Sequence, residues 1–464
     1  MIKTIKTKNI LFALLLCSII FAVFYPILNN DFLYEWDDQW VVLNHYTDGG
    51  FYIENVWAIF SEFYHGQYSP LNEFLYFILY SLFGYKPLYF HLASLLIHCV
   101  NALLAYKCFT LLLETNTKIK IDYYRKVAFL TALIFSIHPF NVESVAWISA
   151  SKVLVYSFYY LVATYFFIKY LNEKKIKFLI FTTVFFIFSF LGKEQAVTFP
   201  VWMLLIYWIS GYSLKNKTVW ITTVPFILLS IIGGIITILS QSSNGGGLLS
   251  DEPSYELWQR FIYACYTFCE YIFKSIFPFK LSYLYPFPTI VGESLPIWIL
   301  VYPILLAVSI IAFWKQLLKN KVVSFCLIFF FIHIAVALHI IPLSRFAIVA
   351  DRYAYISSLG VCFALSYIIV YLYRNYKKRG KVIIIASLLC YLAYLGIYSN
   401  IRCRVWHNSD TLKEELTEQL MQRYSNINNS INQKEIEEWN FVYQAKEKQS
   451  DPFQIFFKKE RSTC

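Results

Sequence analysis

Paired carboxylates form the first of four charged clusters in an otherwise apolar sequence. The stretch Glu35-Trp36-Asp37-Asp38 places two aspartates next to each other. Adjacent carboxylates repel, so one of them is expected to keep a raised pKa and to serve as a base near neutral pH. Neighbours on an extended segment face opposite ways, so only one of the two can point at a given substrate hydroxyl. The alternative interpretation is a solvated acidic loop.

The second cluster follows a short apolar run that stops at Pro139. His138 and Glu143 flank this stop, and Lys152 follows them, so a base, an acid and a cation are expected at one depth. The alternative is a plain helix-ending turn. The sequence contains no H-x-x-x-H or H-E-x-x-H pattern, so we predict neither a metal site nor a metal cofactor.

Two more clusters supply cations that suit a phosphate. Lys193 and Glu194 lie at the apex of a tight helical hairpin, and a lysine at a membrane surface suits a phosphate group. Arg345 and Arg352 lie at the start of a later apolar run, and arginine is the preferred phosphate fork. The alternatives are an ion pair between Lys193 and Glu194 within the turn, and a local surface pair between Asp351 and Arg352.

A single chemistry unites the four clusters. A carboxylate at the outer leaflet would activate an acceptor hydroxyl, and cations would hold the phosphate that leaves a lipid-linked donor. His91 is a further candidate, two helical turns before His98 on one face of a predicted helix, although each is more simply read as a core histidine. No cofactor other than the lipid-linked substrate is expected.

The composition requires a membrane to position these residues. The 464 residues are 58% hydrophobic and only 15% charged, whereas soluble domains are about a quarter charged. Disordered, collagen-like and disulfide-scaffold classes are excluded on the same grounds. The basic residues cluster in short connections between apolar runs, which indicates membrane topology and makes nucleic acid an improbable partner.

The apolar runs predict about eleven membrane spans with the N-terminus inside and the C-terminus outside. Residues 29–85 contain eight carboxylates and no lysine or arginine, so we expect a large outer loop, while 374–381 give the strongest inside signal. The predicted spans are 10–28, 87–113, 127–137, 153–170, 178–191, 196–210, 219–239, 296–314, 322–341, 353–372 and 382–398.

Two other segments are predicted to be of different character. The run 257–277 lies between two outer connections, so it is expected to be an interfacial helix. The tail 401–464 is charged and mildly amphipathic, which predicts a short helical tail outside the membrane, following a membrane domain over 1–400.

Several motifs resemble one family in the order in which they occur. His138 to Ile148 resembles the H-P-x-x-x-E-S-V-A-W signature of bacterial relatives of the transmembrane and tetratricopeptide-containing O-mannosyltransferases. Ser69 departs from the family, which has histidine before this proline, and the tail holds no proper tetratricopeptide array. The other matching stretches are Trp36-Asp37-Asp38, Tyr68 to His91, Gly192 to Pro200, Tyr285 to Pro288, Asp351 to Tyr355 and Trp406 to Leu412.

This resemblance implies an all-α polytopic membrane protein with the GT-C glycosyltransferase fold. It implies that a polyprenyl-phosphate sugar is the donor and that the first outer loop carries the catalytic carboxylate, Asp37 or Asp38. It also places donor phosphate at Lys193 and Arg352, and the tail then corresponds to a truncated repeat region. The candidates for the donor- and phosphate-binding side of the site are Lys193, Arg352, His138, Glu143, Lys152 and Arg345, with His91 and Glu194 as further candidates.

Together with the charged clusters, the resemblance implies a glycosyltransferase of a bacterial cytoplasmic membrane. It would transfer a mannose-like sugar to a hydroxyl of a protein or glycan acceptor on the outer face, in contact with membrane lipids. The alternative from another class is a transporter or lipid-linked-sugar flippase. Transporters place polar residues near the bilayer midplane and often show inverted repeats, whereas the polar residues here gather at the outer ends of the spans. A non-enzymatic assembly protein is disfavoured because the charged candidates are present.

Overall fold

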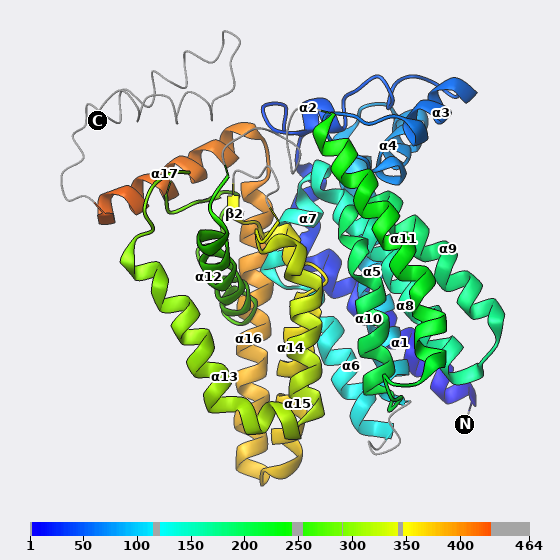
Figure 1. Ribbon diagram of the computed structural model, residues 1–464, viewed down its shortest axis with the longest axis vertical. Coiled ribbons are helices and arrows are strands. Elements are labelled where there is room, and N and C mark those ends of the chain that lie inside the picture. The colour runs from blue at the N-terminus through cyan, green and yellow to red at the C-terminus, as the bar shows by residue number, and fades with distance from the viewer. Residues whose placement is uncertain (1, 115–120, 244–253, 290, 342–346, 428–464) are drawn as a thin grey trace. The chain divides into compact units, whose positions relative to one another are not determined.

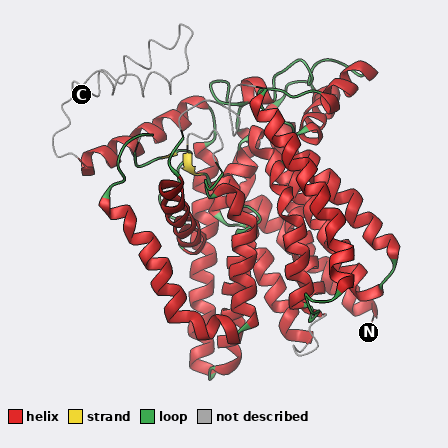
Figure 2. Cartoon of the chain, in the orientation of Figure 1, coloured by secondary structure: helices red, strands yellow, loops and turns green. Residues whose placement is uncertain are grey.

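Apolar helices make up most of the chain. In the computed structural model, which describes residues 2–114, 121–243, 254–289, 291–341 and 347–427, seven helices are long and apolar enough to cross a membrane. An eighth crossing arises if the bent pair Tyr123–Ser136 and Pro139–Ala146 is one span. Only one short pair of strands occurs among these residues (Figure 2). The chain is an all-α polytopic membrane protein.

The chain divides into two compact units, Met1–Leu412 and Lys413–Cys464. In the first half the helices are α1 (Ile2–Phe24), α2 (Asp38–Val41), α3 (Ile53–Ser61), α4 (Pro70–Phe83), α5 (Pro87–Glu114), α6 (Ile121–Ser136), α7 (Val142–Ala146), α8 (Lys152–Glu173), α9 (Ile176–Gly192), α10 (Phe199–Ile209) and α11 (Lys217–Ser242). The remaining helices are α12 (Leu257–Ile276), α13 (Val301–Lys319), α14 (Lys321–Ile334), α15 (Ser358–Asn375), α16 (Lys378–Val405) and α17 (Ser409–Ile427). The tail beyond residue 427 lies outside the described residues.

Local sequence sets the helix ends. Pro70 and Pro87 stand at the first positions of α4 and α5, where the missing amide hydrogen costs nothing. The side chains of Asn216 and Asn320 accept hydrogen bonds from the first amides of α11 and α14. Lys174 ends α8 in the left-handed conformation, which turns the chain directly into α9.

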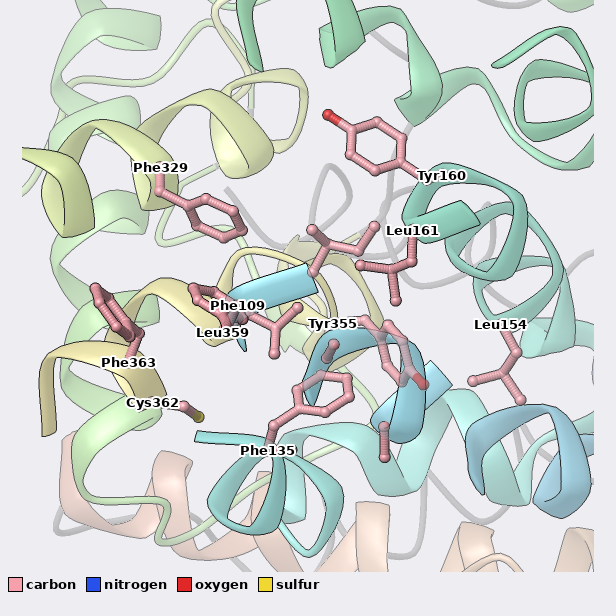
Figure 3. Close-up of a cluster of buried hydrophobic side chains, with 14 of the residues drawn as sticks. Phe109, Phe135, Leu154, Tyr160, Leu161, Phe329, Tyr355, Leu359, Cys362 and Phe363 are labelled. Atoms are coloured by element: carbon pink, nitrogen blue, oxygen red, sulfur yellow. The ribbon is translucent and has the colours of Figure 1, made fainter. Parts of the chain in front are cut away.

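The core of the helix bundle is aromatic and aliphatic. Phe109 stacks on Phe363 with ring centres 5.1 Å apart, and Phe135 meets Tyr355 edge-on at 5.0 Å (Figure 3). These rings come from α5, α6, α15 and the turn before α15, so the core joins spans that are distant in the sequence. Because the interior is dry, the charged clusters must be satisfied by one another or at the ends of the bundle.

Acidic and basic connections lie at opposite ends of the bundle. Helices α2, α3 and α4 of the acidic segment lie at one end in Figure 1. The lysine-containing connections α8–α9, α13–α14 and α15–α16 lie at the other end. This segregation is what the positive-inside rule predicts for a protein with one acidic and one basic side. Which side faces the cytoplasm stays a prediction.

The count of eleven spans is not confirmed. The predicted spans 178–191, 196–210 and 322–341 correspond to α9, α10 and α14, which have 17, 11 and 14 residues. A straight crossing takes roughly 20 residues. The predicted span 127–137 belongs to α6, whose pairing with the helical segment after Pro139 is bent by 53°. By length and composition the structure therefore gives seven crossings, or eight with the bent pair, among the described residues.

A small sheet connects two distant loops beside α12. The segment predicted as interfacial does form a helix, α12, and it is followed by β1 (Tyr285–Pro286). This strand pairs antiparallel with β2 (Ala347–Val349), with Tyr285 opposite Val349. The pairing places the loop after α12 beside Asp351 and Arg352, which follow β2 directly.

Candidate active site

The buried carboxylate of Asp38 fixes the first outer loop to the helical domain. One carboxylate oxygen accepts a hydrogen bond from the Leu33 amide at 2.9 Å, and the other accepts one from the Ser149 amide at 2.9 Å and one from its hydroxyl. Burial raises the pKa of Asp38 to about 6, against these hydrogen bonds, and the Asp37 charge makes a smaller contribution than burial. The raised pKa therefore follows mainly from burial, where we had expected repulsion between the two carboxylates.

Asp37 differs from its neighbour in burial and in hydrogen bonding. It is half-buried, and no group in the described part of the chain hydrogen-bonds its carboxylate. The expectation of an extended segment is wrong, because Asp37 ends a turn in helical conformation and α2 begins at Asp38. Of the two carboxylates, Asp38 is the one that is fully buried and held by hydrogen bonds. The Asp37 carboxylate lies within electrostatic range of Lys152 and Tyr283.

Lys152 links the first outer loop to a second cation. It begins α8, and its ammonium group donates to the side-chain oxygen of Gln67 in the outer segment. It also lies within electrostatic range of Lys193, Glu194 and Asp37. Two like charges held near each other in a partly buried place favour an anion between them.

Lys193 is a buried cation at the turn between α9 and α10. Only 4% of its side chain is exposed, and its ammonium nitrogen lies 3.6 Å from the carboxylate of Glu194. The ion pair within the turn, considered as the alternative, is therefore present. The same nitrogen lies 5.4 Å from the ring centre of Tyr353, the residue after Arg352. Lys193 thus connects the hairpin to the loop that carries the arginine.

Arg352 pairs with Glu143 across 209 positions of the chain, and not with Asp351 as in the alternative considered from the sequence. The Arg352 amide donates to one oxygen of the buried Glu143 carboxylate at 2.8 Å, and its guanidinium Nη1 donates to the other. Within the described residues no other group bonds the guanidinium, so its remaining N–H groups can still take an anion. The guanidinium carbon lies 5.3 Å from a ring centre of Trp147.

Asp351 belongs to a separate buried group. Its carboxylate accepts a hydrogen bond from the Tyr285 hydroxyl at 3.0 Å. Burial and the charge of Glu143 raise the pKa of Asp351, although Arg402, Lys274 and Tyr285 oppose the shift.

A group of aromatic rings lies beside these charges. Its role was not predicted from the sequence. Tyr283 meets Trp36, Trp147 and Trp406 with ring centres 4.7, 5.4 and 5.7 Å apart. Trp147 and Trp406 stack at 5.6 Å. Trp36 and Trp147 lie in the same motifs as Asp37 and Glu143, so their closeness to these carboxylates in the sequence could have marked them as site residues. Nothing local marked Tyr283.

A second missed carboxylate is Glu73 on α4. Burial raises the pKa of Glu73 to about 7, while the Asn44 amide, which donates to it at 3.3 Å, and the Lys152 charge lower it. The sequence places Glu73 in the acidic segment, but that segment holds eight carboxylates, and the sequence does not show which of them are buried.

Three predicted residues are not brought into this cluster. His138 is buried, with one ring nitrogen accepting from the Phe140 amide at 3.2 Å and the other donating to the Ser275 carbonyl at 3.1 Å, so neither is available to a ligand. His91 is buried within α5. Arg345 lies outside the described residues.

In the described part of the chain, neither a metal-binding cluster nor the cavity found between the spans coincides with this site. Among the described residues no group of three or more His, Cys, Asp or Glu side chains could hold a metal ion. A cavity of about 20 Å³, lined by Tyr160, Trp202, His333 and mostly apolar neighbours, lies between the spans. It has room for about one water molecule and contains none of the candidate site residues.

Comparison with known proteins gives distant relatives of one kind, while no family model matches the chain. The protein O-mannosyl-transferase F38B6.6 of Caenorhabditis elegans is 26% identical over 204 residues, 42% of this chain and 28% of that protein. The protein O-mannosyl-transferase TMTC1 of mouse and that of human are each 30% identical over 132 residues, 26% of this chain. The match covers 13% and 14% of those two proteins, so the chain spans only a small part of its relatives.

The chain is distantly related to proteins named protein O-mannosyl-transferases. This relationship and the apolar helices are the starting point for the function proposed below. Donor, acceptor and membrane side belong to the proposal that follows.

Proposed function

We propose that this chain is a membrane glycosyltransferase with the GT-C fold that uses a polyprenyl-phosphate sugar. It transfers a mannose-like sugar to a hydroxyl of a protein or glycan acceptor on the outer face of a bacterial cytoplasmic membrane. The observation that carries the proposal is the convergence of one unpaired carboxylate, Asp37, with three cations, Lys152, Lys193 and Arg352, from four distant segments.

The charges fit the two ends of the reaction. Asp37 takes the proton of the acceptor hydroxyl, whose oxygen forms a bond to the anomeric carbon of the sugar. The bond between that carbon and the phosphate oxygen breaks, and polyprenyl phosphate leaves with the electron pair. Lys193 and Arg352 stabilise the negative charge that grows on the phosphate, within a partly dry site where such interactions are strong.

A transfer assay with labelled donors tests the proposal. The purified chain in lipid vesicles is given polyprenyl-phosphate mannose, glucose or galactose, together with serine- and threonine-containing peptides or a glycan. We expect label on the acceptor with one of these sugars, and an Asp37→Asn variant that transfers about 10²- to 10⁴-fold more slowly.

The same vesicles test the transporter alternative. A flippase would move the labelled lipid between leaflets without transferring its sugar, and Asp37→Asn would leave that movement unchanged. Sugar movement without transfer, in a protein that is shown to be folded, would overturn the proposed function.

A further inference from the structure

Helix α12 holds the loop that presents Arg352. The buried Tyr271 hydroxyl accepts a hydrogen bond from the Ala350 amide at 2.9 Å and donates one to the Ala350 carbonyl at 3.1 Å. Ala350 is 1% exposed and lies between the end of β2 and Asp351. Buried backbone groups need partners, and here one side chain supplies both of them at the point where strand pairing ends.

The same helix also holds the segment that presents Glu143. Ser275, about one helical turn after Tyr271, accepts a hydrogen bond from His138 through its carbonyl at 3.1 Å. His138 in turn receives the Phe140 amide and so shapes the turn that leads into α7. Adjacent turns of α12 therefore hydrogen-bond the two segments that carry Arg352 and Glu143.

Tyrosines of α16 fix the end of α12. The Tyr391 hydroxyl donates to the Ile276 carbonyl at 2.8 Å, and the Tyr394 hydroxyl donates to the Pro278 carbonyl. The Tyr398 hydroxyl accepts from the Leu281 amide at 3.0 Å. Since α12 is held on this side, Tyr271 is a firm support for Ala350.

We propose that Tyr271 is a positioning residue for the phosphate-binding arginine, an inference that rests on the proposed function. The Arg352 amide and guanidinium both donate hydrogen bonds to Glu143. A shift of Ala350 would therefore move both contacts and change the direction of the guanidinium N–H groups that do not bond Glu143. Arg352 holds the donor phosphate in the ground state and also stabilises the charge that grows on it in the transition state. Loss of the Tyr271 hydroxyl therefore weakens phosphate binding and raises the KM for the donor, and it lowers kcat as well.

Tyr271→Phe tests this directly, with Tyr263→Phe as the matched control. Tyr263 lies on the same helix, is equally buried, and its hydroxyl bonds Thr289 at 2.6 Å, away from Ala350. Binding of polyprenyl phosphate alone is measured on the full chain in nanodiscs, together with donor KM, kcat and the melting temperature. We expect Tyr271→Phe to bind polyprenyl phosphate roughly 5- to 100-fold more weakly, and Tyr263→Phe to change it less than about twofold.

Either of two results with the single variants overturns the inference, and a third test uses a double variant. One is unchanged phosphate binding in Tyr271→Phe, and the other is an equal loss in both variants, which would mark a general effect on folding. When Arg352→Lys is already present, Tyr271→Phe should weaken phosphate binding little further, because Tyr271 acts through the arginine. If the two substitutions weaken binding independently, Tyr271 does not act through Arg352. The binding measurement decides the inference even if the wild-type chain transfers no sugar, so its failure is distinct from failure of the proposed function.

Discussion

The two aspartates of the first outer loop have different tasks. Asp38 is buried and its carboxylate accepts three hydrogen bonds, so it holds the loop in place. Asp38→Asn replaces one acceptor oxygen with an amide NH2 group, a donor that faces other donors, and it should lower stability by about 1–3 kcal/mol. Asp37→Asn should melt like the wild type and lose only turnover. Thermal unfolding and sugar transfer, measured on both variants, separate the roles, and a stable but inactive Asp38→Asn beside an active Asp37→Asn would reverse them.

Binding of the donor phosphate should weaken on loss of either cation, the buried Lys193 or the partly exposed Arg352. Lys193→Ala removes a charge-assisted bond worth roughly 1.5–3 kcal/mol, so donor binding should weaken by about 10- to 150-fold. Arg352→Ala would leave the buried Glu143 carboxylate without its partner and could unfold the protein. Arg352→Lys is therefore the variant to test, because it keeps the positive charge and loses the bidentate guanidinium. The exposed Lys175, which pairs with Glu173, provides the control Lys175→Ala. Equal donor affinity in Lys193→Ala and Lys175→Ala would reduce Lys193 to a local ion pair.

The raised pKa of Glu73 makes stability depend on pH. Because the folded state holds its proton up to about pH 7 while the ordinary value is 4.5, this group favours the fold fully below pH 4.5, and the effect is lost as the pH rises to 7. Glu73→Gln should therefore remove part of the fall in melting temperature over this range. Glu54→Gln, at an exposed position of the same loop, is the control. Identical pH profiles for wild type and Glu73→Gln would contradict the assigned burial.

The sequence predicts an ion pair only when its two residues are close together in the chain. Lys193 and Glu194 are neighbours, and their ion pair follows from spacing alone. The partner of Arg352 is 209 positions away, and no periodicity links the two. His138 was predicted beside the phosphate because it shares a motif with Glu143, but the bend after α6 turns its ring toward α12.

At the scale of elements, α8 and α9 pack closely where α9 ends. A Cβ at Gly192 would lie 3.0 Å from both Cα and the amide nitrogen of Tyr156, and backbone atoms cannot rotate away. Gly192→Ala should therefore push α9 outward, displace Lys193 and cost about 1–3 kcal/mol.

Gly234 provides the control for this contact. It lies inside α11 with nothing within 4 Å of an added Cβ, so Gly234→Ala should be neutral or stabilise the helix by up to about 1 kcal/mol. Melting temperature and donor binding are measured for both variants. A Gly192→Ala protein that binds donor as the wild type does would show that the position of Lys193 is insensitive to this packing.

Long apolar helices were predictable, and short elements were not. Spans such as α5 and α16 follow from continuous apolar runs because a bilayer demands that all backbone groups be satisfied within the helix. The strands β1 and β2 have two and three residues, too few for an alternating pattern to show. Pro139 predicted that α6 would stop, but the sequence does not fix how far the chain then bends.

At the scale of the whole molecule, the topology decides whether the site can act outside the cell. The acidic segment with α2, α3 and α4 and the basic connection between α15 and α16 lie at opposite ends of the bundle (Figure 1). Lysine and arginine stay on the cytoplasmic side during insertion, so the Asp37 end is expected to face outward. Charge placement thus predicts sidedness even where the number of crossings is unsettled.

Labelling of single introduced cysteines with a membrane-impermeant maleimide tests this orientation. Asp48→Cys and Lys377→Cys lie at exposed positions of the acidic loop and of the α15–α16 connection. In intact cells stripped of their outer barrier, Asp48→Cys should react at once and Lys377→Cys only after permeabilisation, with the wild-type chain as the background control for its native cysteines. Reaction of Lys377→Cys alone would place Asp37, Lys193 and Arg352 on the cytoplasmic side. Sugar transfer would then take place on the inner face, and an acceptor outside the membrane would be ruled out.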